Sequence, residues 1–431
     1  MAAVDPYQAT RAFLAREGDL LTAGPQRYDL RRFRRVLVVG AGKAGAPMAQ
    51  AVEAVLGDRI DAGLVVVKTG HGGPTQRIEI AEAAHPRPDA AGVEAGRRIL
   101  ALAEEAGPDD LVIALLSGGG SALLVAPAPG ISLADLQTMT DALLASGATI
   151  HEINCLRKHC ESLKGGQLAR AVAPANLLTL ALSDVVGSPL DVIASGPTVP
   201  DATTWDDAWA IVRRYDLAEK LPRSILTRLQ AGREGRLPDT PKAGDPIFAR
   251  SQTLVVADNR VAALAAAERA AELGYNPLLL TTYLEGEAAQ VARVAVALAR
   301  EVQAHGRPVA PPACLILGGE TTVTLGSSAG QGGRNQELAL SAALALDGSQ
   351  GITIASLATD GTDGPTDSAG GLADGGTVAR GRALGLDAEE HLRRHDAYPY
   401  LRATHDLLLT GPTQTNVNDL VFVFVDRPQH Q

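Results

Sequence analysis

The chain has 431 residues, of which 46% are hydrophobic and 45 are glycine, and it carries a net charge of -10. This length exceeds one ordinary hydrophobic core and predicts two domains. The composition favours alternating strands and helices over a disordered chain or an all-β fold. The negative charge argues against a nucleic-acid partner. The longest basic block, from Arg31 to Arg35, is also short.

The three cysteines, Cys155, Cys160 and Cys314, form an odd set without metal-ligand spacing. The N-terminus lacks the charged and apolar segments of a secretory signal. No apolar stretch reaches the roughly 18 to 20 residues that a membrane span needs without interruption by glycine or charge. We therefore expect a cytoplasmic protein with no membrane partner.

Apolar runs of strand length alternate with alanine- and leucine-rich helical stretches in the first half of the chain. This alternation is typical of stacked βαβ units and a largely parallel sheet. The predicted strands are Val36 to Val39, Gly63 to Val67, Arg77 to Ala81, Leu111 to Leu116 and Leu177 to Leu182. The predicted helices are Ala44 to Leu56, Ala90 to Ala106, Ser132 to Ser146 and Glu152 to Ala171.

A segment rich in Arg, Gly, Pro and Lys between about Leu217 and Asp245 predicts a boundary loop. After it, the predicted strands are Thr253 to Ala257, Pro277 to Thr281, Cys314 to Leu317, Thr322 to Leu325, Ile352 to Leu357, Leu407 to Leu409 and Leu420 to Val425. The predicted helices are Val261 to Leu273 and Glu285 to Ala304. We expect two Rossmann-like α/β domains of unequal size, 1–245 and 246–431, with the active-site cleft between them.

Residues 35–45 read RVLVVGAGKAG, so that Gly40, Gly42 and Gly45 have the spacing of a dinucleotide-binding turn, with Lys43 inside it. A dinucleotide site also needs an acidic residue about 20 positions on, but the next strand ends in Lys68. NAD is therefore poorly supported, and NADP requires Lys68 to meet a 2′-phosphate. The alternative is a turn that only packs a helix on a strand. Lys43 favours a different anionic ligand at this helix start.

Polar and glycine-rich turns follow most of the predicted strands, where ligands of open α/β sheets bind. Each turn alone also fits ordinary turn or helix-capping chemistry, and Arg334 could pair with Glu337. The candidate phosphate- or nucleotide-binding residues are Gly40, Gly42, Ser117, Gly118, Gly119, Gly120, Ser121, Gly332, Gly333, Asn335, Thr413 and Asn416. The candidate carboxylates are Asp184, Glu320, Asp360 and Asp363.

Together these turns supply the groups that phosphoryl transfer needs. Glycine loops hold a nucleotide, the carboxylates hold Mg²⁺, and the isolated cations Lys43 and Arg334 offset the charge of the transferred group. Hydride transfer would not need so many carboxylates. The Walker A pattern and the protein-kinase motifs are absent from the sequence, which indicates a different nucleotide fold.

The histidines do not join this set at the sequence level. His71 and His85 lie in turns near strands of the first domain, and His151 and His159 flank an expected helix start. They have neither zinc-ligand spacing nor a G-x-S-x-G elbow beside them. We interpret them as loop-structuring residues.

The ordered set of motifs resembles the glycerate 2-kinase family, whose N-terminal glycerate kinase domain is Rossmann-like and whose C-terminal domain is the MOFRL domain. The resemblance runs over nearly the whole chain. In the first domain it rests on GAGKA, AHPRPD, SGGGSALL, LRKHCESLKGGQLA, SDVVGS and IASGPT. In the second it rests on GGETTV, GGRNQE, ATDGTDGPTD and TGPTQTNVND.

The resemblance implies transfer of the γ-phosphate of ATP to the 2-hydroxyl of D-glycerate with a divalent metal. It implies that Lys43 and Arg334 face each other across the interdomain cleft and bind the phosphoryl group and the substrate carboxylate. Asp184 is then a metal or base residue, and Gly118 to Gly120 form a phosphate loop. The chain departs from the family at Ser188, where Asp is more usual.

Two alternatives remain open. Relatives have been labelled hydroxypyruvate reductases, so an NAD(P)H-dependent reductase is the enzyme alternative. A nucleotide-binding protein without chemistry is the other. A homodimer is compatible with the sequence, which fixes no oligomeric state.

Overall fold

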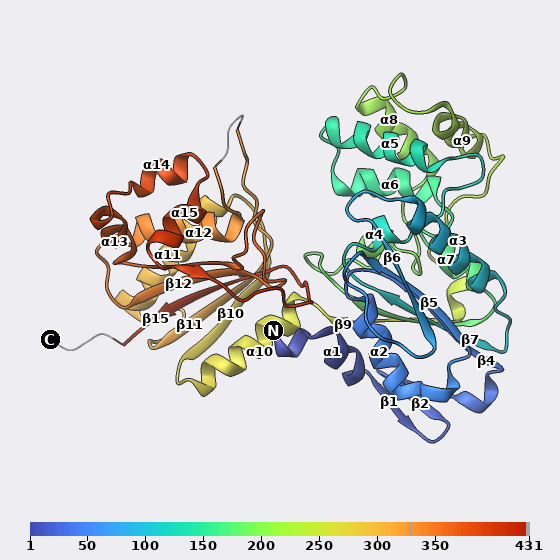
Figure 1. The fold of residues 1–431 in the computed structure, drawn as a ribbon, viewed down its shortest axis with the longest axis horizontal. Coiled ribbons are helices and arrows are strands. Elements are labelled where there is room, and N and C mark those ends of the chain that lie inside the picture. The colour runs from blue at the N-terminus through green and yellow to red at the C-terminus, as the bar shows by residue number, and fades with distance from the viewer. Residues whose placement is uncertain (327–329, 428–431) are drawn as a thin grey trace. The chain divides into compact units, whose positions relative to one another are not determined.

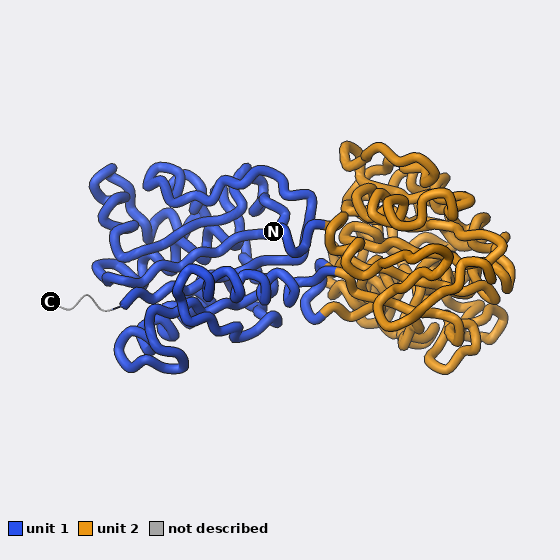
Figure 2. Tube along the Cα trace, turned by 90° about the horizontal axis from the view of Figure 1, so that it is seen from below, with its two compact units in different colours: residues 1–5, 184–187, 257–431 blue, residues 6–183, 188–256 orange. Residues whose placement is uncertain are grey.

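The computed structural model describes residues 1–326 and 330–427. The chain divides into two compact units, which are coloured separately in Figure 2. Unit 1 consists of Met1–Asp5, Asp184–Gly187 and Ala257–Gln431, and unit 2 of Pro6–Ser183 and Ser188–Val256. Each unit is an α/β structure with its own six-stranded sheet (Figure 1).

The six-stranded sheet of unit 2 has the strand order β6-β5-β4-β7-β8-β9. The β5–β6, β4–β5, β4–β7 and β7–β8 pairs are all parallel, as the sequence predicts. The interiors of strands β4 and β7, at the centre of this sheet, are nearly continuous Val, Leu, Ile and Ala, as expected of a parallel sheet buried on both faces. The strands are β4 Arg35–Ala41, β5 Ala62–Lys68, β6 Ile78–Ala83, β7 Asp110–Leu116, β8 Asn176–Leu182 and β9 Ser251–Ala257.

Unit 2 differs from the sequence prediction in its helices and in an added small sheet. The single helix predicted from Glu152 to Ala171 is wrong: α6 ends at Cys160, and Gly165 and Gly166 turn the chain with φ values of 56° and 78° before α7. Helix α9 lies inside the predicted boundary loop. An antiparallel sheet of β1 Leu14–Glu17, β2 Leu20–Ala23 and β3 Gln26–Asp29 was not predicted.

The helices of unit 2 begin with side-chain caps at several places, such as the capping box of Thr149 and Glu152 at α6. Its α-helices are α1 Pro6–Ala12, α2 Gly45–Leu56, α3 Ala90–Glu104, α4 Gly120–Leu123, α5 Leu133–Ala145, α6 Ile150–Cys160, α7 Gln167–Val172, α8 Trp205–Arg214 and α9 Arg223–Arg233. Short 3-10 helices cover Leu30–Arg32, Gly57–Arg59, Ile193–Ser195 and Pro246–Arg250.

The sheet of unit 1 has the order β10-β11-β15-β12-β13-β14 and is mixed. Within the described part of unit 1, β10 and β11 pair in parallel, and the other neighbouring strands pair antiparallel. Strand β15, which is the last in sequence, inserts between β11 and β12. The predicted strand from Thr322 to Leu325 is wrong, since Thr322 makes only an isolated bridge with Glu287. The strands are β10 Asn276–Leu284, β11 Ala313–Gly319, β12 Ile352–Ala358, β13 Gly370–Asp374, β14 Leu407–Leu408 and β15 Asp419–Val425.

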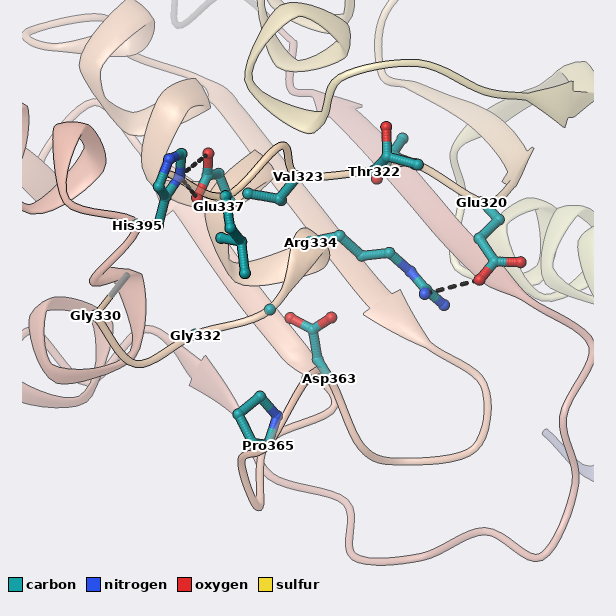
Figure 3. A pocket seen from close by; sticks show the side chains of 14 residues that line it. Glu320, Thr322, Val323, Gly330, Gly332, Arg334, Glu337, Asp363, Pro365 and His395 are labelled. Atoms are coloured by element: carbon teal, nitrogen blue, oxygen red, sulfur yellow. Dashed lines mark hydrogen bonds and ion pairs between the residues drawn. The ribbon is translucent and has the colours of Figure 1, made fainter. Parts of the chain in front are cut away.

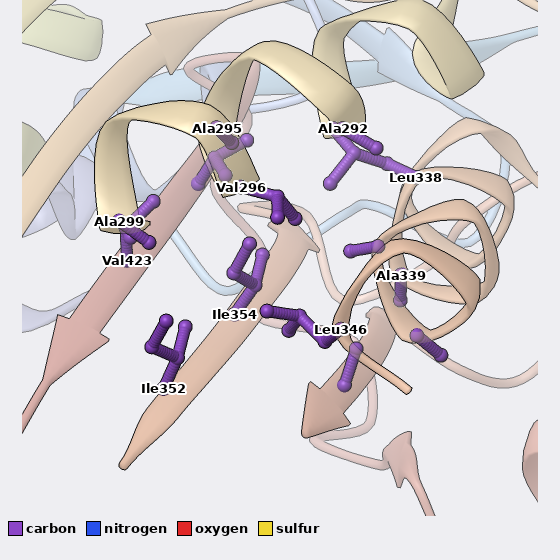
Figure 4. Close-up of a cluster of buried hydrophobic side chains, with 14 of the residues drawn as sticks. Ala292, Ala295, Val296, Ala299, Leu338, Ala339, Leu346, Ile352, Ile354 and Val423 are labelled. Atoms are coloured by element: carbon purple, nitrogen blue, oxygen red, sulfur yellow. The ribbon is translucent and has the colours of Figure 1, made fainter. Parts of the chain in front are cut away.

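Helices α11 and α12 pack on this sheet and form the core of unit 1 (Figure 4). The small side chains of Ala292, Ala295 and Ala299 lie on one face of α11 and allow a close approach to Leu338 of α12 and Ile354 of β12. The helices are η1 Ala2–Val4, α10 Asn259–Glu272, α11 Ala288–His305, α12 Arg334–Leu346, α13 Thr377–Ala383, α14 Ala388–Arg393 and α15 Ala397–Ala403. Across the described ranges, no helix is both long and apolar enough to cross a membrane.

Candidate active site

The GAGKAG turn of unit 2 joins β4 to α2 and packs closely on the neighbouring strand. A Cβ on Gly40 would lie 2.3 Å from the carbonyl oxygen of Leu115, and a Cβ on Gly42, whose φ is 143°, would lie 2.1 Å from Ser117 Oγ. These glycines are needed for the approach of β4 to β7. The packing alternative that the sequence left open therefore describes Gly40 and Gly42 well.

Lys43 lies where the GAGKAG turn meets the SGGGS turn that follows β7. Its backbone N–H donates to the carbonyl of Gly118 at 2.8 Å, and the N–H of Ala44 donates to Ser117 Oγ at 3.1 Å. The two glycine-rich turns are thereby fixed to each other. Gly119 has a φ of 81°, and a Cβ there would lie 3.4 Å from Lys43 Cγ. The lysine side chain therefore lies over the second turn.

Three further basic side chains lie near Lys43, at the carboxyl ends of β5 and β6. Lys68 ends β5, and His71 and His85 follow β5 and β6. A Cβ on Gly119 would lie 3.0 Å from His85 Cδ2, so the imidazole covers this turn. We refer to Lys43, Lys68, His71 and His85 as the basic cluster.

The charges of Lys43 and Lys68 act on both imidazoles of the basic cluster. Burial, and after it the nearby charges of Lys43, Lys68 and His71, lower the pKa of His85 to about 4. Burial and the charge of Lys68 also lower the pKa of His71. Both imidazoles are thus held neutral beside the two lysines, which is the environment expected of a site for an anion. The sequence interpretation missed these two histidines as candidate site residues.

The SGGGS turn is held by hydrogen bonds between hydroxyl and amide groups of Ser121, Ser195 and Asn154. Ser121 Oγ lies 2.8 Å from Ser195 Oγ, which donates to Asn154 Oδ1 of α6 at 3.1 Å. Ala194 and Ser195 have φ values of 50° and 62°, an uncommon conformation for residues with side chains. A Cβ on Gly120 would lie 2.7 Å from that of Ala194. Strain of this kind persists where the surrounding structure fixes it, often at functional sites.

In unit 1, Arg334 begins α12 and is held by two carboxylates. Its Nε and Nη2 donate to the carboxylate of Asp419 at 2.5 and 3.0 Å, and Nη1 lies 2.8 Å from Glu320 Oε1. The fork geometry is the one that arginine makes with a carboxylate. The Arg334–Glu337 pair that the sequence left open does not form, because Arg334 pairs with Glu320 and Asp419.

Both members of the Arg334–Asp419 pair have a raised pKa, for different reasons. Burial disfavours the charged form of Arg334, but the hydrogen bonds with Asp419 and the charges of Asp419 and Glu320 outweigh it, and the pKa is raised. Burial raises the pKa of Asp419 to about 6, although the hydrogen bonds from Arg334 lower it. The pair is therefore ionised at neutral pH.

Asn418 connects this ion pair to Asp184. Its Nδ2 donates to Glu320 Oε2 at 2.8 Å and to the backbone carbonyl of Asp184 at 2.7 Å. Asp184, Glu320 and Arg334, all predicted site residues, are thus brought together in unit 1. Asn418 and Asp419 were not selected from the sequence, although both belong to the TGPTQTNVND motif.

The other predicted carboxylates of unit 1 are occupied by local hydrogen bonds. The carboxylate of Asp363 accepts from the N–H groups of Asn335 and Gln336 at 3.2 and 2.9 Å and so caps α12. Asp360 Oδ1 accepts from the N–H of Thr362 at 2.9 Å. Within residues 1–326 and 330–427, no three histidine, cysteine, aspartate or glutamate side chains form a group that could hold a metal ion.

The predicted glycines and polar residues of unit 1 hold its loops against one another. A Cβ on Gly333 would lie 2.3 Å from Asp363 Cγ, and the carbonyl of Gly332 would lie 2.3 Å from a Cβ on Gly364. Thr413 N–H donates to the carbonyl of Asp360 at 3.1 Å. Asn416 Oδ1 accepts from the N–H of Asn418 at 3.1 Å.

A pocket of about 430 Å³ opens beside Arg334 (Figure 3). Arg334 and Glu320 lie at one end of it, and Glu337 and His395 lie at the other. His395 Nδ1 lies 3.0 Å from each oxygen of the Glu337 carboxylate. The volume of this pocket falls in the usual range for small-molecule sites.

Comparison with known proteins identifies the class of protein that this fold and site define. The family described as "Domain of unknown function (DUF4147)" matches residues 1–230, and the MOFRL family matches residues 313–419. The chain is therefore an α/β protein that combines these two domains.

Similar proteins carry kinase and reductase names. The "Glycerate 2-kinase" of Pyrococcus horikoshii is 41% identical over 98% of this chain and 94% of its own length. A "Putative hydroxypyruvate reductase" of Agrobacterium vitis is 47% identical over 91% of this chain and 87% of its own length. The crystal structure of glycerate kinase from Thermotoga maritima is 41% identical, with a TM-score of 0.87 over 98% of this chain and 96% of that one. The chain belongs to the glycerate 2-kinase family, and its predicted α/β class is confirmed.

Proposed function

We propose that this protein is an ATP-dependent glycerate 2-kinase, which transfers the γ-phosphate of ATP to the 2-hydroxyl of D-glycerate and releases ADP. The observation that carries the proposal is the 41% identity with the Pyrococcus glycerate 2-kinase over 98% of the chain. The matched region covers both domains. The reductase name is putative, and the strand after the glycine turn ends in Lys68 rather than an acid.

In the proposed reaction, the 2-hydroxyl oxygen of glycerate attacks the γ-phosphorus, and the bond from phosphorus to the ADP oxygen breaks. Asp184 is our candidate for the base that takes the hydroxyl proton. Lys43 and Arg334 bind the phosphoryl group and the substrate carboxylate. The reaction depends on positioned charge more than on a protein nucleophile. The basic cluster around Lys43 supports this assignment, because it favours an anionic ligand.

We propose that Mg²⁺ arrives with ATP and is held mainly by phosphate oxygens. This fits the donor set, because Mg²⁺ takes oxygen ligands and commonly binds through one or two carboxylates plus substrate phosphates. The candidate carboxylates are those of Asp184, Glu320, Asp360 and Asp363, of which Glu320 also pairs with Arg334 and Asp363 also caps α12. When bound, the ion offsets the negative charge of the transferred phosphate. We also propose a cytoplasmic location, because the three cysteines are buried free thiols.

A steady-state assay separates the three candidate functions. Purified protein with ATP, Mg²⁺ and D-glycerate should produce ADP, and omission of D-glycerate should abolish that production. Parallel reactions with hydroxypyruvate and NADH or NADPH should consume no reduced cofactor. Turnover of reduced cofactor would establish the reductase instead, and absence of both activities would leave a binding protein.

A further inference from the structure

The pocket beside Arg334 has an apolar wall and an excess of negative charge. Val323, Leu325 and Pro365 supply apolar surface to its lining. Three carboxylates, those of Glu320, Glu337 and Asp363, also line it, together with a single guanidinium, that of Arg334. The guanidinium is already paired with Glu320 and with the carboxylate of Asp419, which is not among the lining residues. At the Glu337 end of the pocket, away from Arg334, this charge would repel the triphosphate chain of a nucleotide and the glycerate anion.

One polar atom of the pocket has no partner. Thr321 lines the pocket and is 4% exposed, yet its Oγ1 has no hydrogen-bond partner. A buried hydroxyl without a partner costs about 1 to 3 kcal/mol, and such a group in a native protein calls for an explanation. A ligand in the pocket would satisfy it.

The Glu337 carboxylate provides a second recognition group at the end of the pocket away from Glu320. His395 Nδ1 fixes it, and each carboxylate oxygen keeps capacity to accept from a ligand. Carboxylates in nucleotide-binding folds accept hydrogen bonds from ribose hydroxyls. The pocket thus combines an apolar wall for a planar ring with acceptors for neutral donor groups.

We propose that this pocket of unit 1 binds the nucleoside part of the phosphoryl donor, with Thr321 and Glu337 as its recognition residues. The inference rests on the proposed kinase function for the identity of the donor. The apolar wall contacts the base, Glu337 accepts from the ribose hydroxyls, and Thr321 Oγ1 bonds a polar atom of the nucleoside. The phosphates remain outside this acidic pocket.

Adenosine, which has no phosphate, tests the pocket independently of catalysis. In saturation-transfer NMR with the full-length protein, we expect signal on the adenine and ribose protons, and at least a twofold loss of that signal in Glu337→Gln. Neither tripolyphosphate nor D-glycerate should displace adenosine. Absence of saturation transfer, or displacement by D-glycerate, would overturn the proposal even if the protein proves to be an active kinase.

Thr321→Val tests the unpartnered hydroxyl, with Thr321→Ser as the matched control. We expect a three- to tenfold rise in KM for ATP in the valine variant, less than a twofold change in KM for D-glycerate, and recovery in the serine variant. Because Thr321 Oγ1 has no partner in the protein, the melting temperature of the ligand-free valine variant should not fall. A lower melting temperature with an unchanged KM for ATP would make Thr321 structural and overturn its assignment. Absence of glycerate kinase activity in the unmodified protein would refute the kinase function but leave the adenosine result to be judged separately.

Discussion

Replacement of Arg334 by glutamine should destabilise unit 1 strongly, because it leaves the buried carboxylate of Asp419 without its cation. The Asp419 side chain is 5% exposed and the Arg334 side chain 33%. Removal of one partner from a buried ion pair costs about 3 to 5 kcal/mol. Since a third of Arg334 reaches solvent, we expect the lower value, about 3 kcal/mol. For a unit of this size, that corresponds to a fall of about 6 to 12 °C in melting temperature.

Thermal unfolding followed by circular dichroism measures this effect, and two further variants control it. Asp419→Asn combined with Arg334→Gln removes both charges and should recover part of the loss. Arg393→Gln removes an exposed partner from the Arg393–Glu390 pair of the same unit and should cost less than about 1 kcal/mol. If Arg334→Gln melts no lower than Arg393→Gln, the ion pair does not stabilise the unit and the reasoning fails.

The loss of stability in Arg334→Gln should depend on pH. The pKa of Asp419 in the folded protein, about 6, lies above its unfolded value of about 4. The folded state therefore binds the extra proton, and the stability that it contributes is lost as the pH rises from about 4 through 6. Loss of Arg334 raises this pKa further. Arg334→Gln should thus be destabilised less at pH 5 than at pH 8, and equal destabilisation at both would contradict the charge argument.

Three other predictions concern unit 2. Lys43→Ala should lower kcat about 10² to 10³-fold, as loss of one electrostatic donor does, and near-normal kcat would remove Lys43 from catalysis. Gly40→Ala should lower the melting temperature, because the new Cβ would lie 2.3 Å from the Leu115 carbonyl oxygen, and an unchanged melting temperature would show that β4 and β7 can separate. The imidazole resonances of His85 should titrate in NMR spectra with a pKa of about 4, whereas a midpoint near the ordinary value of about 6.5 would contradict its burial beside two lysines.

Strand periodicity in the sequence predicts unit 2 better than unit 1. The parallel strands of unit 2 are local apolar runs separated by helices, so each is visible within its own sequence window. In unit 1, β15 inserts between β11 and β12, and nothing in the local sequence of β15 specifies those distant partners. Helix α12 was not predicted because its N-terminal residues read as a glycine-rich turn. Their helical state depends on the Asp363 cap, which lies 28 positions from Asn335.

In the candidate site, too, local sequence patterns indicate some residues, and distant contacts determine the others. Motifs next to strands make Lys43, Asp184, Glu320 and Arg334 candidates from the sequence alone. The basic cluster was not predicted, since the turns containing His71 and His85 come next to Lys43 only through the order of β4, β5 and β6. Asp419 was missed for a related reason, because its role depends on Arg334, 85 positions away. These roles depend on tertiary contacts, which local motifs do not encode.

Proton-coupled phosphorus NMR of the reaction mixture tests the kinase function most directly. Protein, ATP, Mg²⁺ and D-glycerate should yield ADP and a new phosphomonoester signal split into a doublet, because the 2-phosphate of glycerate is attached to a carbon with one hydrogen. A triplet would show transfer to the 3-hydroxyl, whose carbon carries two hydrogens, and would contradict the proposed regiochemistry. Absence of any new phosphomonoester signal while ATP remains intact would contradict the kinase function itself.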